Sequence, residues 1–275
     1  MGQPKVHPRA IVDPGAILHD DVEVGPGAVI EAGAEIGAGS RILANACIHG
    51  GTVMGERNVV HPNAVIGGAP QDSHFKGEKS YLRIGSGNQF REFCSVNRAT
   101  GEGQATVIGD RNMLLLSSHV GHNAVIGNDC IIEGVAMIAG HVTLEDRVLI
   151  AGLAGVHQFC RVGRLAMIGF GGGISQDLPP FMMAVDVRPF YVVGPNVIGL
   201  RRAKIEPKAR TAIKRAYKLI CRSGLPLPEV LAELDKETAP EVAEIARFVR
   251  ASKKGVIRRG TRRGADVGGS GGGED

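Results

Sequence analysis

Four histidines in the middle of the chain are the residues whose spacing most clearly suggests chemistry. His119 and His122 lie on either side of Val120, and His141 and His157 follow at similar intervals further along. Imidazole gains and loses a proton near neutral pH, so it can accept a proton from a hydroxyl group at pH 7. A single surface histidine is as often a solvated polar side chain. The set of four favours a catalytic base with polar neighbours.

These histidines belong to a strict six-residue repeat. An aliphatic residue occupies one position of each repeat in the series Val6, Val12, Leu18, Val24, Ile30, Ile36, Ile42, Ile48, Met54, Val60 and Ile66. Apolar residues resume in the same phase at Ile84, Phe90 and Val96, and the series continues from Ile108 to Ile174. An amphipathic helix has a period of about 3.6 residues and a strand a period of about 2, so neither produces this spacing. A triangular parallel β-helix does, because one aliphatic side chain points inward on each flat side.

This fold places the histidines at one edge. Each coil contains three repeats, about 18 residues, and neighbouring coils stack about 4.8 Å apart. His122, His141 and His157 therefore lie near one corner on successive coils. Two polar stretches, residues 67–80 and 97–106, lack the inward aliphatic residues, so they are predicted to be loops that leave the coils. Loops on a rigid scaffold often carry function, although a tolerated insertion has the same pattern.

The composition changes after Pro179. Helical spacing of apolar residues appears in residues 206–223, 227–238 and 240–253, with a proline near the start of each stretch. This pattern predicts a mainly β protein with a small α-helical domain at the end of the β-helix. The predicted boundaries are residues 1–185 for the β-helix, 186–256 for the helical domain and 257–275 for a disordered tail rich in Gly and Arg.

Composition argues against several classes of protein. No apolar run reaches the roughly 20 residues needed to span a membrane, and the first residues lack the apolar stretch of a signal peptide. The five cysteines have no paired spacing, and Cys94, Cys130 and Cys160 fall on one inward position of the repeat. These three are predicted to be reduced core residues. We expect a cytoplasmic protein without stable membrane insertion, disulfides or a metal site.

Several short motifs add to this pattern. They are SHVGH at residues 118–122, AGHV at 139–142, GVHQFC at 155–160 and QDLPP at 176–180. Others are QD at 71–72 with GE at 77–78, Asn196 with GLRR at 199–202, AYKLI at 216–220 and RSG at 222–224. Together they resemble the UDP-N-acetylglucosamine O-acyltransferase family of lipid A synthesis, and they follow its order along nearly the whole chain. The resemblance implies a left-handed β-helix and a homotrimer with sites between subunits. Only the resemblance indicates this handedness, because the usual rule for parallel crossovers is right-handed.

The resemblance implies a role for each site residue. His122 corresponds to the general base, which removes the proton from the sugar 3-hydroxyl as that oxygen attacks an acyl thioester. The backbone N–H of Gly140 corresponds to the hydrogen-bond donor for the developing oxyanion. Asn123 stands where the family has an acid next to the base. The implied contacts with the sugar, the diphosphate, the nucleotide or the pantetheine arm come from Gln71, Asp72, His74, His119, His141, His157, Gln158, Asn196, Arg201 and Arg202.

Four departures from the family pattern bear on activity. Asn123 can accept a hydrogen bond from the imidazole, but it cannot stabilise an imidazolium as a carboxylate does. His74 replaces a lysine, while Ile198 and Ala203 replace an acidic and a basic residue near the nucleotide. Phe170 follows Gly169, where the family measures acyl length at a pair of glycines. We therefore expect the Phe170 ring to stop the acyl chain early and to select a shorter donor.

The resemblance also implies the reaction partners. The donor would be a 3-hydroxyacyl group carried on the phosphopantetheine of acyl carrier protein, with no other cofactor. Basic residues crowd positions 201–222 and would attract this acidic protein. Nucleic acid is a weaker alternative, because no aromatic stacking residues accompany the charge.

Three other interpretations remain open at this point. A zinc site like that of trimeric β-helix carbonic anhydrases would use a wider histidine spacing than His119 and His122 have. The sister N-acyltransferase that acts on UDP-3-O-acylglucosamine carries an additional N-terminal uridine-binding domain, whereas here the repeat starts at Val6. A β-helix scaffold without catalysis is the third interpretation, and Asn123 in place of the family acid favours it to some extent. Either a hydroxyl or an amine at the sugar 3-position fits the motifs.

Overall fold

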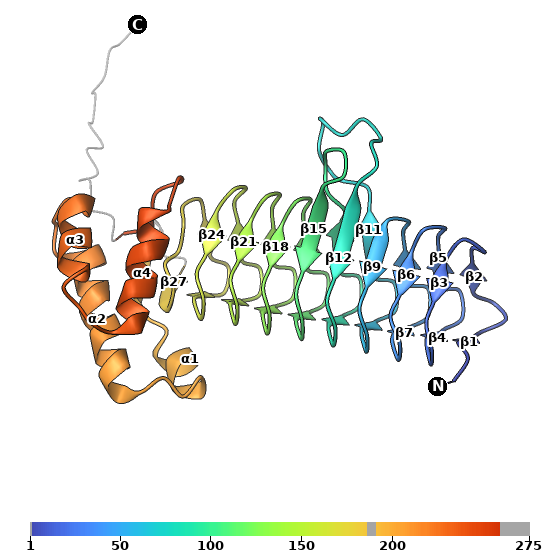
Figure 1. The fold of residues 1–275 in the computed structure, drawn as a ribbon, viewed down its shortest axis with the longest axis horizontal. Coiled ribbons are helices and arrows are strands. Elements are labelled where there is room, and N and C mark those ends of the chain that lie inside the picture. The colour runs from blue at the N-terminus through green and yellow to red at the C-terminus, as the bar shows by residue number, and fades with distance from the viewer. Residues whose placement is uncertain (1, 186–190, 259–275) are drawn as a thin grey trace, which may run out of the picture.

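The N-terminal part of the chain winds into a long three-sided prism of short strands, and helices close its C-terminal end (Figure 1). The computed structural model describes residues 2–185 and 191–258. Each side of the prism is a sheet, and the coils are joined by parallel pairing between strands of successive turns. The predicted β-helix of hexapeptide repeats with a C-terminal helical region is confirmed.

The strands are short because the chain turns after each one. The first sheet contains β1 (Lys5–Val6), β4 (Glu23–Val24), β7 (Arg41–Ile42), β10 (Val59–Val60), β13 (Gln89–Phe90), β16 (Met113–Leu114), β19 (Ile131–Ile132), β22 (Leu149–Ile150), β25 (Met167–Ile168), β27 (Met182–Val185) and the antiparallel β28 (Tyr191–Pro195). The second contains β2 (Ile11–Val12), β5 (Val29–Ile30), β8 (Cys47–Ile48), β11 (Val65–Gly68), β14 (Ser95–Asn97), β17 (His119–Val120), β20 (Met137–Ile138), β23 (Gly155–Val156) and β26 (Gly173–Ile174). The third contains β3 (Ile17–Leu18), β6 (Glu35–Ile36), β9 (Thr52–Met54), β12 (Tyr81–Ile84), β15 (Ala105–Ile108), β18 (Val125–Ile126), β21 (Thr143–Leu144) and β24 (Arg161–Val162).

Three corners connect the sheets. The first corner joins the first sheet to the second and contains Val135, the second corner joins the second sheet to the third and contains His122 and His141, and the third corner joins the third sheet to the first and contains Asn112. Residues with positive φ turn the chain at these corners, including Val135 (60°) and His141 (58°). The second corner therefore carries the predicted base.

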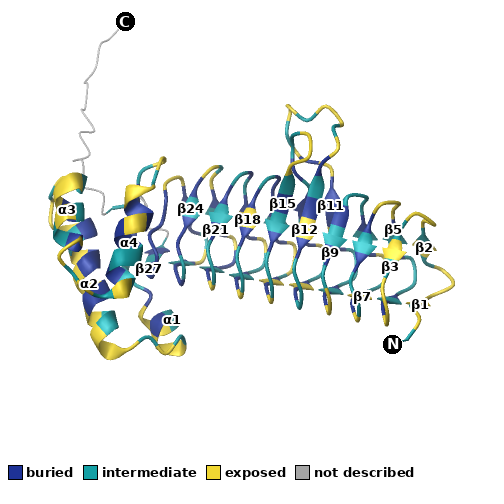
Figure 2. Ribbon diagram, viewed as in Figure 1, coloured by how far each residue is buried: buried dark blue, intermediate teal, exposed yellow. Residues whose placement is uncertain are grey.

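The aliphatic residues of the repeat fill the prism. Most are fully buried, and so are Cys94, Cys130 and Cys160, as predicted (Figure 2). Burial raises the pKa of the Cys94 and Cys130 thiols to about 12, so both stay protonated and unreactive at neutral pH. The first coil differs, because no further coil covers it: Val6 is 44% exposed although it occupies the inward position.

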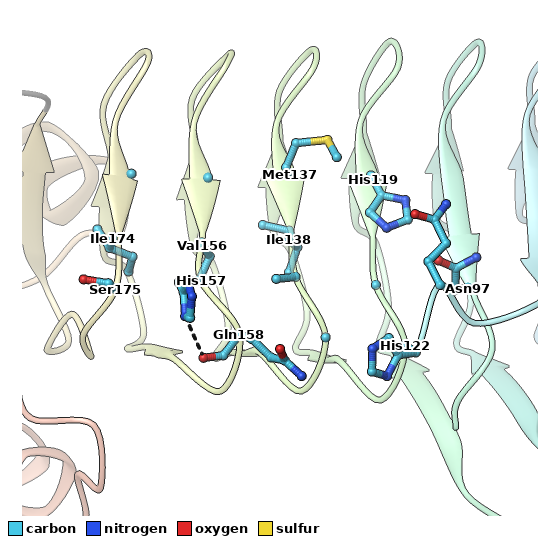
Figure 3. A pocket seen from close by; sticks show the side chains of 16 residues that line it. Asn97, His119, His122, Met137, Ile138, Val156, His157, Gln158, Ile174 and Ser175 are labelled. Carbon is cyan, nitrogen blue, oxygen red and sulfur yellow. Dashed lines mark hydrogen bonds between the residues drawn. The ribbon is translucent and has the colours of Figure 1, made fainter. Parts of the chain in front are cut away.

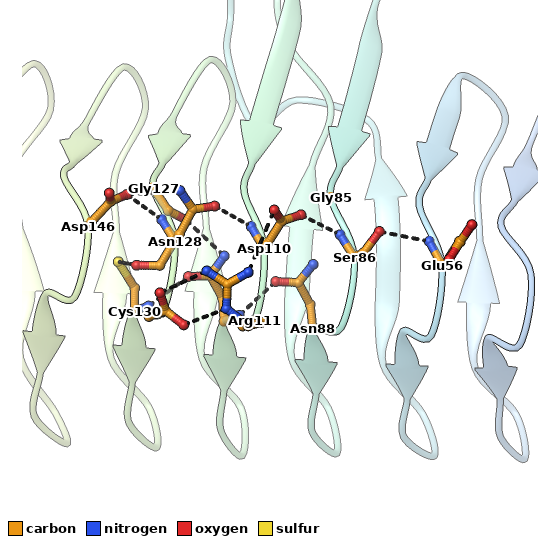
Figure 4. A network of polar contacts seen from close by, with 12 residues as sticks. Glu56, Gly85, Ser86, Asn88, Asp110, Arg111, Gly127, Asn128, Cys130 and Asp146 are labelled. Carbon is orange, nitrogen blue, oxygen red and sulfur yellow. Dashed lines mark hydrogen bonds and ion pairs between the residues drawn. The ribbon is translucent and has the colours of Figure 1, made fainter.

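Polar side chains hold successive coils together along the third corner (Figure 4). In an outer ladder, a backbone N–H of one coil donates to a side-chain oxygen of the next coil. The Glu56 N–H donates to the Ser86 hydroxyl at 3.0 Å. The N–H groups of Ser86, Asp110 and Asn128 donate in the same way to the side chains of Asp110, Asn128 and Asp146, each at 2.7 Å. In an inner ladder, Asn88 Oδ1 accepts the Asn112 N–H at 2.8 Å, and Asn112 Oδ1 accepts the Cys130 N–H at 2.8 Å. These bonds satisfy backbone N–H groups that no strand pairs.

Two loops project from the second corner (Figure 1). They span residues 69–80 and 98–104, because β11, β14 and β15 extend into the ranges predicted as loops. Hydrogen bonds join them: the Gly101 N–H donates to Glu78 Oε1 at 2.7 Å, and the Gly103 N–H donates to the Lys79 carbonyl at 2.8 Å. The two loops therefore form one unit beside the histidines.

The helices are α1 (Val197–Arg202), α2 (Pro207–Arg222), α3 (Leu227–Leu234) and α4 (Pro240–Arg250). Prolines stand in the first turn of α2, α3 and α4, where a missing N–H costs no hydrogen bond. A bidentate ion pair between Arg164 and Glu244 joins α4 to the last coils, at 2.7 and 2.9 Å. α1 was not predicted, because its few residues show no helical period of their own.

Residues 257 and 258, just after the predicted boundary at residue 256, contact the helical domain and the last coils. Ile257 is buried and donates its N–H to the Asp177 carbonyl at 2.9 Å, and the Arg258 guanidinium donates to the carbonyls of Ile220 and Leu225. The rest of the predicted tail, residues 259–275, and the boundary near residue 186 lie outside the described residues. No helix in the described ranges is long and apolar enough to cross a membrane.

Candidate active site

A cavity of about 630 Å³ runs along the outer face of the second sheet, next to the second corner. Asn97 and His119 lie at one end of it, and Ile174 and Ser175 lie at the other (Figure 3). Its lining residues are Gln71, Asn97, His119, Gly121, His122, Met137, Ile138, Ala139, Gly140, Gly155, Val156, His157, Gln158, Gly173, Ile174 and Ser175. The structure thus brings together six of the predicted site residues, Gln71, His119, His122, Gly140, His157 and Gln158, from one loop and three coils.

His122 is the most deeply buried histidine of the site. It follows β17, is 7% exposed, and its Nδ1 lies 2.9 Å from Asn123 Oδ1. Its Nε2 has no hydrogen bond to another described residue. Which ring nitrogen of His122 carries the proton depends on whether the oxygen or the nitrogen of the Asn123 amide faces the ring.

The second loop fixes the orientation of the Asn123 amide. The Thr100 N–H donates to Asn123 Oδ1 at 2.9 Å, and Asn123 Nδ2 donates to the Thr100 carbonyl at 3.0 Å. Since the oxygen of the amide faces His122, Nδ1 of the imidazole must be the protonated nitrogen. Nε2 then carries the free lone pair, which is what a general base requires.

Gly140 lies one coil beyond His122. A Cβ added to it would be 2.6 Å from His122 Nε2, so the imidazole packs directly on the glycine. Its N–H donates no hydrogen bond within the described chain. Pro14 and Pro26 occupy the same position of the repeat, which shows that the fold does not need this N–H. A free lone pair and a free amide donor therefore lie side by side.

Two further imidazoles surround His122. The His141 ring centroid lies 5.2 Å from that of His122, edge to face, and stacks on Phe159 at 4.7 Å. His119 Nδ1 lies 2.8 Å from the Ser95 hydroxyl. Burial, reinforced by the nearby His122, lowers the pKa of both His119 and His141 below its usual range. Both rings are therefore neutral at pH 7.

Asp72 comes from the first loop. Its Oδ1 accepts the His74 N–H and lies 3.0 Å from His74 Nδ1, while its Oδ2 lies 3.9 Å from His122 Nδ1. Hydrogen bonds from the backbone and side chain of His74 lower the pKa of Asp72 to about 2. The carboxylate is charged at any pH at which the protein would be assayed.

Four predicted contacts lie away from this cavity. Phe170 stands at the first corner and is 71% exposed. Asn196 caps α1: its Oδ1 accepts the Gly199 N–H at 3.0 Å and its Nδ2 donates to the Leu165 carbonyl at 3.0 Å. Arg201 and Arg202 belong to α1 itself. Within one chain, these side chains do not reach the lining of the cavity.

Four predicted residues border the cavity without lining it: Asp72 and Asn123, which contact or approach His122, and His74 and His141. His141 lines a second hollow of about 600 Å³, between the second corner and the segment after α4. Lys253 and Lys254 of that segment line the same hollow. The His74 side chain is mostly exposed and contacts the site only through Asp72.

The sequence analysis missed Asn97. It lines the cavity beside His119, is 6% exposed, and donates from Nδ2 to the Ala69 carbonyl at 2.8 Å. Its Oδ1 is buried without a partner in the described chain, so it presents an unused acceptor to the cavity. Its position as the last residue of a strand before a loop was the available signal. Among the described residues, no three His, Cys, Asp or Glu side chains are grouped to hold a metal ion.

Comparison with known proteins identifies the family. A family model described as Udp N-acetylglucosamine O-acyltransferase, domain 2, matches residues 177–257, and a bacterial transferase hexapeptide model matches residues 3–38. An acyl-[acyl-carrier-protein]–UDP-N-acetylglucosamine O-acyltransferase of Stenotrophomonas maltophilia is 45% identical over 258 residues, 93% of this chain and 98% of the relative. This chain belongs to the UDP-N-acetylglucosamine O-acyltransferase family.

Other members of the UDP-N-acetylglucosamine O-acyltransferase family agree along their whole length. The Verminephrobacter eiseniae enzyme of the same name is 45% identical over 260 residues, 92% of this chain and 99% of the relative. The crystal structure of a UDP-N-acetylglucosamine acyltransferase from Bacteroides fragilis has a TM-score of 0.89 and 38% identity, covering 92% of this chain and 100% of that one. The resemblance found in the motifs is confirmed.

Proposed function

We propose that this protein transfers a 3-hydroxyacyl group from acyl carrier protein to the 3-hydroxyl of UDP-N-acetylglucosamine, the first step of lipid A biosynthesis, with His122 as the general base. One observation carries the proposal: His122 Nε2 packs on Gly140 of the next coil, and neither Nε2 nor the Gly140 N–H has a hydrogen-bond partner within the described residues. An acceptor for a proton and a donor for an oxyanion are the two groups that acyl transfer to a hydroxyl requires.

The steps follow from this pair. His122 Nε2 accepts the proton of the sugar 3-hydroxyl as that oxygen attacks the thioester carbonyl carbon. The resulting oxyanion accepts a hydrogen bond from the Gly140 N–H. The C–S bond then breaks, the departing thiolate takes the proton from the imidazolium, and the new ester remains on the sugar.

The polarity of the cavity suggests how the substrates lie. Gln71, Asn97 and His119 form a polar end suited to the sugar hydroxyl and amide groups. Met137, and Gly155 and Gly173 at the same outward position of the next coils, leave an uncharged stretch that suits the pantetheine arm and the acyl chain, with polar contacts from His157 and Gln158. Asp72, His74 and His141 would contact the sugar or the diphosphate from the rim. Acyl carrier protein would approach the basic residues of α1 and α2, including Arg201 and Arg202.

An apolar ridge along the first corner supports a homotrimer. We define this ridge by its exposed residues Phe93, Leu116, Val135, Leu153 and Phe170. The positive φ of Val135 costs about 1–2 kcal/mol for an ordinary residue, and burying its side chain against another copy would offset that cost. Such an arrangement would bring Phe170, Arg201 and Arg202 of one copy to the cavity of the next.

The homotrimer predicts a solution mass of three chains. Light scattering on the purified protein checks it, and Leu153→Asp, which puts a charge on the ridge, is expected to shift the mass toward a single chain. Arg111→Asp, at the exposed third corner, is the matched control and should leave the mass unchanged. A single-chain mass for the unaltered protein would contradict the proposal.

Acyl length is expected to depend on Phe170. In the trimer, its ring would close the apolar end of the neighbouring cavity, so the protein should prefer a shorter 3-hydroxyacyl donor than Phe170→Gly does. The measurement is turnover with UDP-N-acetylglucosamine and with its 3-amino analogue, using acyl carrier proteins loaded with graded chains. If Phe170→Gly does not lengthen the preferred donor, Phe170 is not the stop. Absence of turnover with every donor would instead favour a non-catalytic scaffold.

A cytoplasmic location is part of the proposal. Cys47, Cys94, Cys130 and Cys160 carry free thiols, which is typical of proteins from a reducing compartment.

A further inference from the structure

The proposed base has an orienting partner that carries no charge. When His122 accepts the sugar proton it becomes an imidazolium, and an adjacent carboxylate both orients such a ring and stabilises its positive charge. Asn123 Oδ1, 2.9 Å from His122 Nδ1, orients the ring but cannot stabilise its positive charge. The amide is neutral and is held in place by Thr100.

A carboxylate approaches the same ring nitrogen from the other loop. Asp72 Oδ2 lies 3.9 Å from His122 Nδ1, while Asp72 Oδ1 is occupied by His74. The side chains of His122 and Asp72 are 9% and 15% exposed. Water therefore screens the two charges less than it would at the surface.

The other groups around His122 supply no negative charge. His119 on the same coil and His141 on the next coil are both neutral at pH 7, because burial and His122 lower the pKa of each. His74 faces Asp72 and not the ring of His122. In the described chain, Asp72 is the one carboxylate within ion-pair distance of His122.

We propose that Asp72 is a positioning residue that stabilises the imidazolium form of His122, so that orientation and charge come from two different side chains. Asn123, held by Thr100 of the second loop, sets the tautomer, and Asp72 supplies the charge from the first loop. The inference rests on His122 being the base. It adds to the sugar contact expected of Asp72 a role in the proton transfer itself.

The test is a cycle of Asp72→Asn, Asn123→Asp and the double variant, measured as kcat against pH with both substrates saturating. Asp72→Asn keeps an oxygen for the His74 N–H but removes the charge. In this variant, the acid limb of the kcat profile should move to lower pH by about one unit, since an opposite charge within about 4–6 Å shifts a pKa by at least that much. The plateau value of kcat should fall about tenfold, because one pKa unit of lost interaction corresponds to a factor of ten.

Asn123→Asp restores a carboxylate next to the ring. In the Asp72→Asn background it should return the acid limb and most of the plateau toward those of the unaltered protein, which a residue that only binds sugar would not allow. Asp129→Asn removes an exposed charge at the third corner and serves as the control; its profile should not move. Thermal unfolding of each variant checks that the loops stay folded.

Two results would overturn the inference. An acid limb that stays in place in Asp72→Asn shows that the charge does not act on the base. A double variant no better than Asp72→Asn shows that the two side chains do not share a task. Full activity of His122→Ala would instead refute the proposed base itself, so the two failures are distinguishable.

Discussion

Replacing His122 with alanine is expected to lower kcat by about 10²- to 10⁴-fold, the range that a positioned general base contributes. The variant removes Nε2, the free lone pair beside Gly140, but leaves the aliphatic core of the coil intact. The thermal midpoint should therefore change little, and KM for the sugar should change less than kcat. Steady-state turnover with acyl carrier protein as donor is the measurement.

His19→Ala is the matched control for this variant. His19 is an exposed histidine near the N-terminal end of the prism, paired with Glu35 at 3.0 Å and away from the cavity. Its loss should leave kcat within about twofold, because exposed ion pairs contribute little. Equal activity of His122→Ala and the unaltered protein would rule out the proposed mechanism.

Gly140→Ala is expected to lower kcat by about 10²-fold, the effect of displacing a reacting group by about 1 Å. The added methyl would lie 2.6 Å from Nε2 and 2.7 Å from Cε1 of His122, so the ring must move. The backbone itself accepts alanine at this position of the repeat, since Ala32, Ala38 and Ala44 occupy it in other coils. The loss should therefore appear in kcat and not in the free energy of unfolding.

Gly134→Ala is the control at the same position of the repeat. The nearest atom to its added Cβ is the Leu116 carbonyl oxygen at 3.5 Å, an ordinary contact. Activity should be retained, provided that light scattering shows an unchanged mass. If Gly140→Ala kept full activity, the packing of His122 on this glycine would have no part in catalysis.

The repeat made the fold predictable from the sequence. A period of six allows one main solution, and the inward residues from Val24 onward are buried as expected. Counting residues per coil also placed His122, His141 and His157 near one corner, and His122 and His157 do line one cavity. The prediction weakened at the first coil, where Val6 has no neighbour to cover it, and at the loop edges, where pairing lengthens β11, β14 and β15.

The remaining features depend on contacts that a repeat does not encode. The orientation of the Asn123 amide comes from Thr100 in a loop without a period, and the unused acceptor of Asn97 follows from how that loop leaves the sheet. Asn196 matches a substrate contact of the family by position, yet here both its polar groups cap and anchor α1. Phe170 does not reach the cavity of its own chain, so its expected role depends on the proposed trimer.

The stacking of the coils also sets the dimensions of the proposed reaction centre. The base and the oxyanion donor sit on neighbouring turns, tied by the bond from the His141 N–H to the His122 carbonyl at 2.9 Å. The backbones that carry them are therefore one spacing of backbone pairing apart, about 4.8 Å. Whole turns could be gained or lost before β10 without changing the chemistry, whereas a single residue inserted between His122 and Gly140 would abolish it.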